Sequence, residues 1–68
     1  MTQKELLYLE DACKHEEIIL DVLDDALNTL DDETFLDSIQ TEISIHQRLL
    51  DNLNQLLEDK ANEWSINI

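Results

Sequence analysis

Two stretches of the chain carry apolar residues at alternating steps of three and four. The first row consists of Leu6, Leu9, Cys13, Leu20, Leu23, Leu27 and Leu30, and Glu16 occupies one of its positions. The second row consists of Leu36, Ile39, Ile43, Leu50, Leu53 and Leu57, and His46 occupies one of its positions. Because this spacing puts each row along one side of an α-helix, it predicts two helices.

The ends of these helices are marked by polar residues. Thr2 and Glu5 have the spacing of a capping box, which predicts a helix that begins near residue 3. The apolar pattern stops at an acidic segment, where Asp31 or Asp32 is suited to cap the second helix. We expect helices over about 3–30 and 34–62, a turn over 31–33 and a short apolar tail over 63–68. So short a turn predicts one all-α domain, an antiparallel helical hairpin.

The chain holds more apolar residues than two helices can bury on each other. Ala12, Ile19, Ala26, Phe35, Leu49 and Leu56 broaden the two rows, and Leu7, Tyr8, Ile18 and Val22 lie off them. An apolar surface of this kind indicates an interface, and two-fold dimers are the commonest assemblies. We therefore expect a homodimeric four-helix bundle or a larger homo-oligomeric ring. The apolar tail Trp64–Ile68 is expected to fold over the open end near Leu6.

Composition narrows the function classes. The 68 residues include 17 acidic and 4 basic side chains, a formal charge of -13, one Cys and no Gly. This charge disfavours direct binding to nucleic acid or to an anionic membrane, and no apolar run is long enough to span one. Without Gly, the common nucleotide-binding loops are excluded. A single Cys and the lack of a secretory leader predict a reducing, cytoplasmic location.

Polar residues within the apolar rows suggest a metal site. Glu16 and His46 interrupt the rows, and Glu42 lies one turn before His46 on the same side. Carboxylates and imidazoles in a bundle core are the ligands of di-iron and di-manganese four-helix proteins. Iron, manganese or zinc would suit Glu16, Glu42 and His46. The alternative is a core that holds no metal, in which a carboxylate or a carbonyl satisfies His46 and Glu16 lies at the edge of the bundle and reaches water.

The predicted register determines where such a site would form. With the turn centred near Asp32, His46 faces residue 19, and Glu16 lies about two turns from Glu42 within one chain. A single hairpin would then be unable to assemble the site. An antiparallel two-fold dimer would assemble it, with its axis near the level of Ile19 and Leu20.

Other residues have weaker patterns. His15 is expected on the outer side of the first helix near Glu10, where it is either solvated or part of a second cluster. Cys13 is expected to pack as a small apolar residue. Acidic residues concentrate at the turn, where they favour solubility or the docking of a basic protein partner.

The segment Lys4–Glu17, KELLYLEDACKHEE, resembles a family of small spore-coat-associated proteins of Firmicutes. The segment Ile45–Leu50, IHQRLL, is similar to part of the second helix of that family. The family is related to coat-F-like proteins, so the resemblance implies a ferritin-like fold and a spore-coat location. It points to Glu10, His15, Glu16 and His46 as ligand positions.

Three functions follow as expectations. The first is a non-enzymatic structural or assembly protein, similar to ferritin-like spore-coat components, that acts as a homo-oligomeric bundle. The second is a metal-binding half-ferritin with a carboxylate and histidine site at the dimer interface, which would oxidise ferrous iron. The third is an acidic module that binds a basic protein by charge mimicry.

Overall fold

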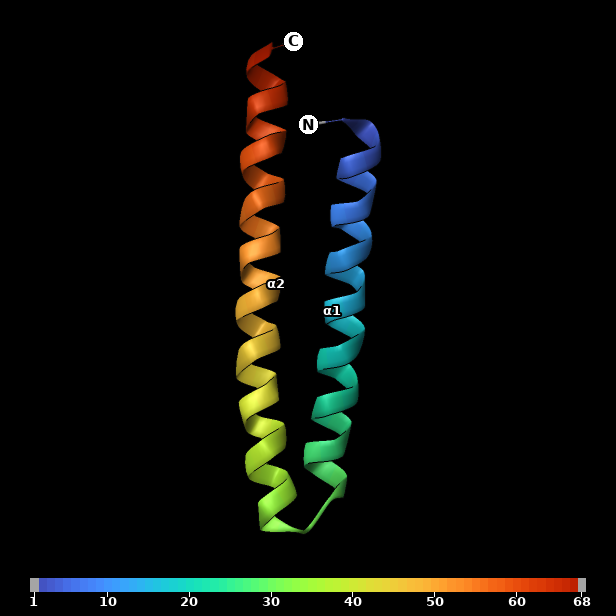
Figure 1. Cartoon of the computed structure of the whole chain (residues 1–68), viewed down its shortest axis with the longest axis vertical. Helices are drawn as coiled ribbons and strands as arrows, with labels where there is room; N and C mark the ends of the chain where they lie inside the picture. Colours follow the sequence, from blue (N-terminus) through green and yellow to red (C-terminus); the bar gives the residue numbers. More distant parts are fainter. Residues whose placement is uncertain (1, 68) are drawn as a thin grey trace.

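The protein is an antiparallel helical hairpin. A computed structural model describes the backbone of residues 2–67 and the side chains of residues 2–62. Helix α1 spans Gln3–Thr29 and helix α2 spans Glu33–Asn67, and residues 2–67 contain no strand. The two helices lie side by side and run in opposite directions, in a molecule of 53 × 15 × 13 Å (Figure 1). The predicted all-α hairpin is confirmed.

Side chains cap both helices at their N-termini. The Thr2 hydroxyl accepts from the backbone N–H of Glu5 at 3.1 Å, and the Glu5 carboxylate accepts from the Thr2 N–H at 3.4 Å. Hydrogen bonds from Thr2 hold the pKa of Glu5 below its ordinary value. At α2, Asp32 accepts from the N–H groups of Thr34 at 2.9 Å and Phe35 at 3.4 Å. The capping box is confirmed, and Asp32 rather than Asp31 caps α2.

The helix boundaries differ from the prediction at the C-terminal end of α2. Helix α1 ends at Thr29, and α2 begins at Glu33 and continues through Asn67 instead of ending near residue 62. With no Gly or Pro in the chain, nothing interrupts the backbone hydrogen bonds of α2 in this segment. The α2 backbone therefore extends past the N-terminus of α1 (Figure 1). The Trp64, Ile66 and Ile68 side chains, predicted to fold over the open end, lie outside the described residues.

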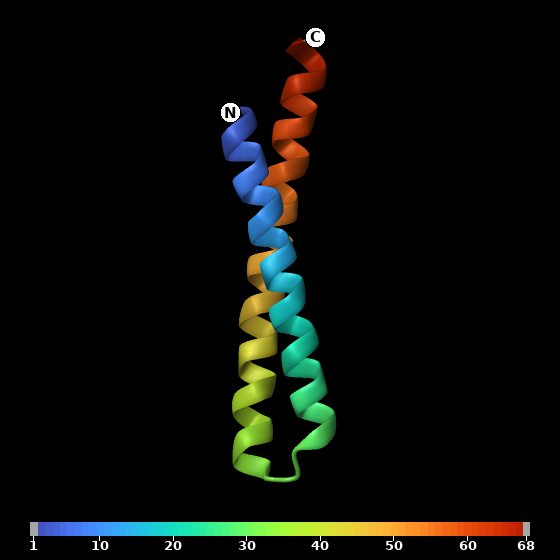
Figure 2. The same cartoon turned by 90° about the vertical axis from the view of Figure 1, so that its right-hand side faces the viewer.

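The core between the helices is thin. Of the described side chains, only Cys13 and Leu50 are buried, at 6% and 8% exposure. The two helices cross at a shallow angle, and the crossing lies near mid-length (Figure 2). The expectation that Cys13 packs as a small apolar residue is confirmed. A pair of helices leaves each row covered from one side only, and for this reason most row residues stay half-buried.

Candidate functional site

Three polar side chains meet at the middle of the hairpin. His46 Nδ1 lies 2.5 Å from Glu16 Oε2, and His46 Nε2 lies 3.6 Å from Glu42 Oε2. Glu16 comes from α1, whereas Glu42 and His46 are one turn apart on α2. The Glu16 side chain is 12% exposed and that of Glu42 is 53% exposed, so the imidazole connects a shielded carboxylate to an open one.

A single chain brings these residues together, so the predicted register was wrong. The connection comprises residues 30–32 and is centred on Asp31, not Asp32. Glu16 lies fifteen residues before Asp31 and His46 fifteen residues after it, so the two residues occupy the same level of the hairpin. The predicted register displaced one helix by about one turn relative to the other. A second copy is not required for Glu16 to reach His46.

The contact with Glu16 determines which ring nitrogen of His46 carries a hydrogen. An ionised carboxylate only accepts, so the short contact with Glu16 requires a hydrogen on Nδ1 of His46. Nε2 then either donates towards Glu42, in the charged imidazolium, or keeps a free lone pair, in the neutral ring. In both states Glu16 fixes the orientation of the ring. The cluster therefore joins α1 to α2 through one charge-assisted hydrogen bond.

The predicted metal ligands do not form a complete site in one chain. Among residues 2–62, no group of three or more His, Cys, Asp or Glu side chains is arranged to hold a metal ion. Glu16 uses one carboxylate oxygen to accept from Nδ1 of His46, while Nε2 of the same ring lies on the side of Glu42. Glu10 and His15 are exposed and, being five residues apart on α1, lie on different sides of it. The metal function stays a prediction.

Cys13 is the more buried of the two buried residues among the described side chains. Burial raises the pKa of its thiol, and the negative charges of Glu17 and Glu10 raise it further. A thiol with a raised pKa is a weak nucleophile at neutral pH. The structure thus assigns Cys13 to packing.

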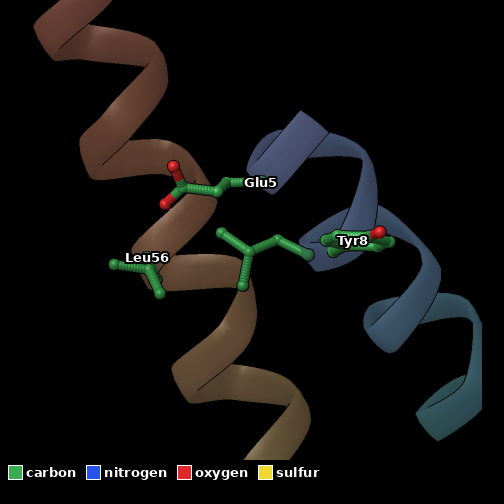
Figure 3. A pocket seen from close by; sticks show the side chains of 4 residues that line it. Glu5, Tyr8 and Leu56 are labelled. Carbon is green, nitrogen blue, oxygen red and sulfur yellow. The ribbon is translucent and has the colours of Figure 1, made fainter. Parts of the chain in front are cut away.

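Both helices contribute to an apolar face, which the sequence interpretation had assigned to the core. The two rows identified in the sequence form the seam between the helices. Beside the seam, each helix has a second row, formed by the residue just before every second seam position and therefore repeating every seven residues. These second rows contain Ala12, Ile19 and Ala26 on α1, and Phe35, Leu49 and Leu56 on α2. Glu5 begins the α1 row, and it lines one pocket together with Leu56, Tyr8 and Leu9 (Figure 3). The two second rows therefore lie on the same side of the hairpin, which we call the apolar face.

The apolar face is largely open to solvent. Phe35 is 60% exposed, Leu49 41%, Leu56 39% and Ile19 36%. The opposite face, formed by residues that follow the seam positions, is polar: Glu10, Glu17, Asp24, Gln40, Gln47 and Asn54, all exposed. The sequence contained this signal, because the two sides differ in their seven-residue repeats. That both rows lie on the same side of the hairpin follows only from the way the two antiparallel helices pack against each other.

Charge is distributed unevenly along the hairpin. Residues 15–47, which we call the turn half, contain ten acidic residues and no Lys or Arg. The rest of the chain, the open half, contains the other seven acidic residues and all four basic ones, Lys4, Lys14, Arg48 and Lys60. The formal charges are thus -10 and -3, which add to -13. The turn half lies around the connection between the helices (Figure 1).

Two further findings concern the chain as a whole. Neither described helix has a stretch apolar enough to cross a membrane. Comparison with protein-family models, with curated proteins and with solved structures found no significant match.

Proposed function

We propose that this chain is a non-enzymatic assembly protein that works as a homo-oligomeric helical bundle. The observation that carries the proposal is the apolar face, to which both helices contribute and which stays exposed among the described side chains. Contiguous exposed apolar surface of this kind marks an interaction site in proteins. The thin core supports the same conclusion, because two helices of this length bury too little apolar surface to be stable alone.

The chain exposes more surface than a compact monomer of its mass, and the excess is about the area that one partner would cover. A compact monomer of 8.0 kDa is expected to expose about 4,450 Å², whereas this chain exposes 5362 Å². The difference of about 900 Å² is close to the ~800 Å² that each partner buries in an interface of standard size. One interface would bring the exposure of this chain to that of an ordinary globular protein.

A second copy of the chain fits this surface. Two hairpins whose apolar faces meet form a four-helix bundle, with the polar faces directed outward. The α1 row has small side chains at Ala12 and Ala26, while the α2 row has the larger side chains of Phe35, Leu49 and Leu56. The faces are therefore ridged and can interdigitate without overpacking. Among the described side chains of the two rows, the only carboxylates are those of Glu5 and Glu42, so these residues would bury little charge.

Sedimentation equilibrium of the wild-type chain tests this proposal. We expect a dimer or a higher homo-oligomer at micromolar concentration. Leu49→Gln should weaken association by at least about tenfold, because each copy loses a buried leucine side chain. Ile18→Gln is the matched control: Ile18 is 61% exposed and belongs to neither row of the apolar face, so its variant should assemble like the wild type. A monomeric wild type would refute the proposal.

The finer expectations remain predictions. A spore-coat location, a ferritin-like metal centre and the docking of a basic protein rest on the sequence alone. The assembly proposed here is compatible with each of them, since it covers the apolar face and leaves the acidic surfaces exposed.

A further inference from the structure

We infer that the second copy binds with its turn at the opposite end of the bundle, about a two-fold axis level with Glu16 and His46. This inference rests on the proposed function and adds the orientation of the partner. Two apolar faces can meet in two ways, with the turns at the same end or at opposite ends. In both, neighbouring helices run antiparallel and the alanines of α1 meet larger side chains. Size matching therefore does not choose between them.

Charge does choose between the two orientations. With the turns at the same end, the two turn halves, each of formal charge -10, would lie side by side. With the turns at opposite ends, each turn half lies against an open half of charge -3, which holds all the Lys and Arg residues. Neighbouring helices in a bundle are 8–10 Å apart, about one Debye length at physiological salt, so repulsion between them is only partly screened. Opposite ends are favoured.

The level of the axis follows from the apolar face. With the axis level with Glu16, Ala12 lies opposite Ile19 of the second copy. On α2, Phe35 lies opposite Leu56 of the second copy and Glu42 opposite Leu49 of the second copy. The α1 helix, Gln3–Thr29, is then overlapped along almost its whole length, because Glu16 is its midpoint. This register uses the full apolar face.

The axis predicted from the sequence is less favourable. Placed level with Ile19, it would bring Glu42 opposite Glu42 of the second copy. Two carboxylates on either side of a closed interface repel each other, and each has been removed from water. The register centred on Glu16 sets Glu42 against an aliphatic side chain and keeps it beside Nε2 of its own His46. Electrostatics thus favours the same level as the overlap of the helices.

Distances between two spin labels, measured by double electron–electron resonance, test the orientation. Cys13→Ala removes the native thiol, and a nitroxide is attached to Asn28→Cys, an exposed position near the turn. With turns at opposite ends, the two labels are about 36 Å apart along the bundle, since each lies twelve residues from the axis. With turns at the same end, they are about 20–25 Å apart, the width of two helices.

A label at Ser44→Cys in the same background is the matched control, because Ser44 lies close to the axis level. Its two labels should be within about 25 Å in either orientation. A short distance at Asn28→Cys in a sample that sediments as a dimer would overturn the orientation and leave the proposed function standing. A monomer by sedimentation, with no dipolar coupling at either position, would overturn both.

Discussion

At the scale of single residues, Glu16 connects the two helices through a hydrogen bond that is largely shielded from water. Its carboxylate accepts from His46 Nδ1 at the midpoint of α1. Hydrogen bonds that involve a charged group contribute about 1.5–3 kcal/mol, more than neutral ones. Because a one-turn shift of either helix would break this contact, the pair also fixes the register. This role explains two polar residues in otherwise apolar rows.

Replacing Glu16 tests that role. We expect Glu16→Ala to lower the free energy of unfolding by about 1–2 kcal/mol, because His46 loses the acceptor for its Nδ1 hydrogen. Urea denaturation at one fixed protein concentration measures the change. Glu17→Ala is the control, since Glu17 is exposed on the same helix and gains the same helix propensity. Equal stability of the two variants would contradict the assignment.

Cys13 predicts a loss of stability in alkaline solution. The folded protein holds the thiol proton more tightly than the unfolded chain, because burial and nearby carboxylates raise its pKa. The contribution of the thiol is complete below the pKa of the unfolded chain and is lost as the pH rises through the folded pKa. Wild type should therefore lose more stability than Cys13→Ala between about pH 8 and pH 10. Parallel curves from thermal denaturation would show that the thiol does not contribute.

At the scale of the helices, a side chain caps the N-terminus of each helix. The connection between them contains no glycine. The connection reverses the chain within residues 30–32, and no described residue has a positive φ. Thr2 and Asp32 accept the N–H groups that the first turn of each helix would leave unpaired. The start of α2 therefore depends on one aspartate.

Asp32→Ala tests the capping of α2. We expect it to reduce the free energy of unfolding by about 1 kcal/mol, the usual effect of losing an N-cap. Asp31→Ala removes the same charge one residue earlier, but the N–H groups of Thr34 and Phe35 donate to Asp32. Asp31→Ala should therefore be close to neutral, or slightly stabilising, because it lowers the acidic charge at the turn. A larger loss for Asp31→Ala than for Asp32→Ala would show that the cap has been misassigned.

Most of the helical structure could be predicted from periodicity, and the remaining errors have local causes. The rows from Leu6 to Leu30 and from Leu36 to Leu57 specify two helices regardless of where the turn is centred. The level of Glu16 relative to His46 depends on that centre, and an error of one residue there shifts the facing level by two. A turn centre placed one to two residues too late therefore moved the residue expected to face His46 from Glu16 to Ile19, about one helical turn.

At the scale of the whole molecule, the hairpin has more surface than a compact chain of its mass, and one of its two broad faces is apolar. The sequence predicted that a partner was needed, since two helices cannot cover all these apolar residues. It did not separate the apolar face from the core, because both follow the same seven-residue repeat, displaced by one position. Which residues remain exposed is decided by the pairing of the helices, which is tertiary information.

The uneven charge of the hairpin has a consequence for the rate at which it folds. Contacts close to the connection span the shortest loops and are therefore the first that a folding hairpin can form. Here those contacts draw together the turn half, with ten acidic residues and no Lys or Arg. Repulsion thus opposes the earliest steps, before the apolar contacts of Cys13 and Leu50 exist to offset it. Added salt, by screening that repulsion, lowers the folding barrier and speeds the formation of the hairpin.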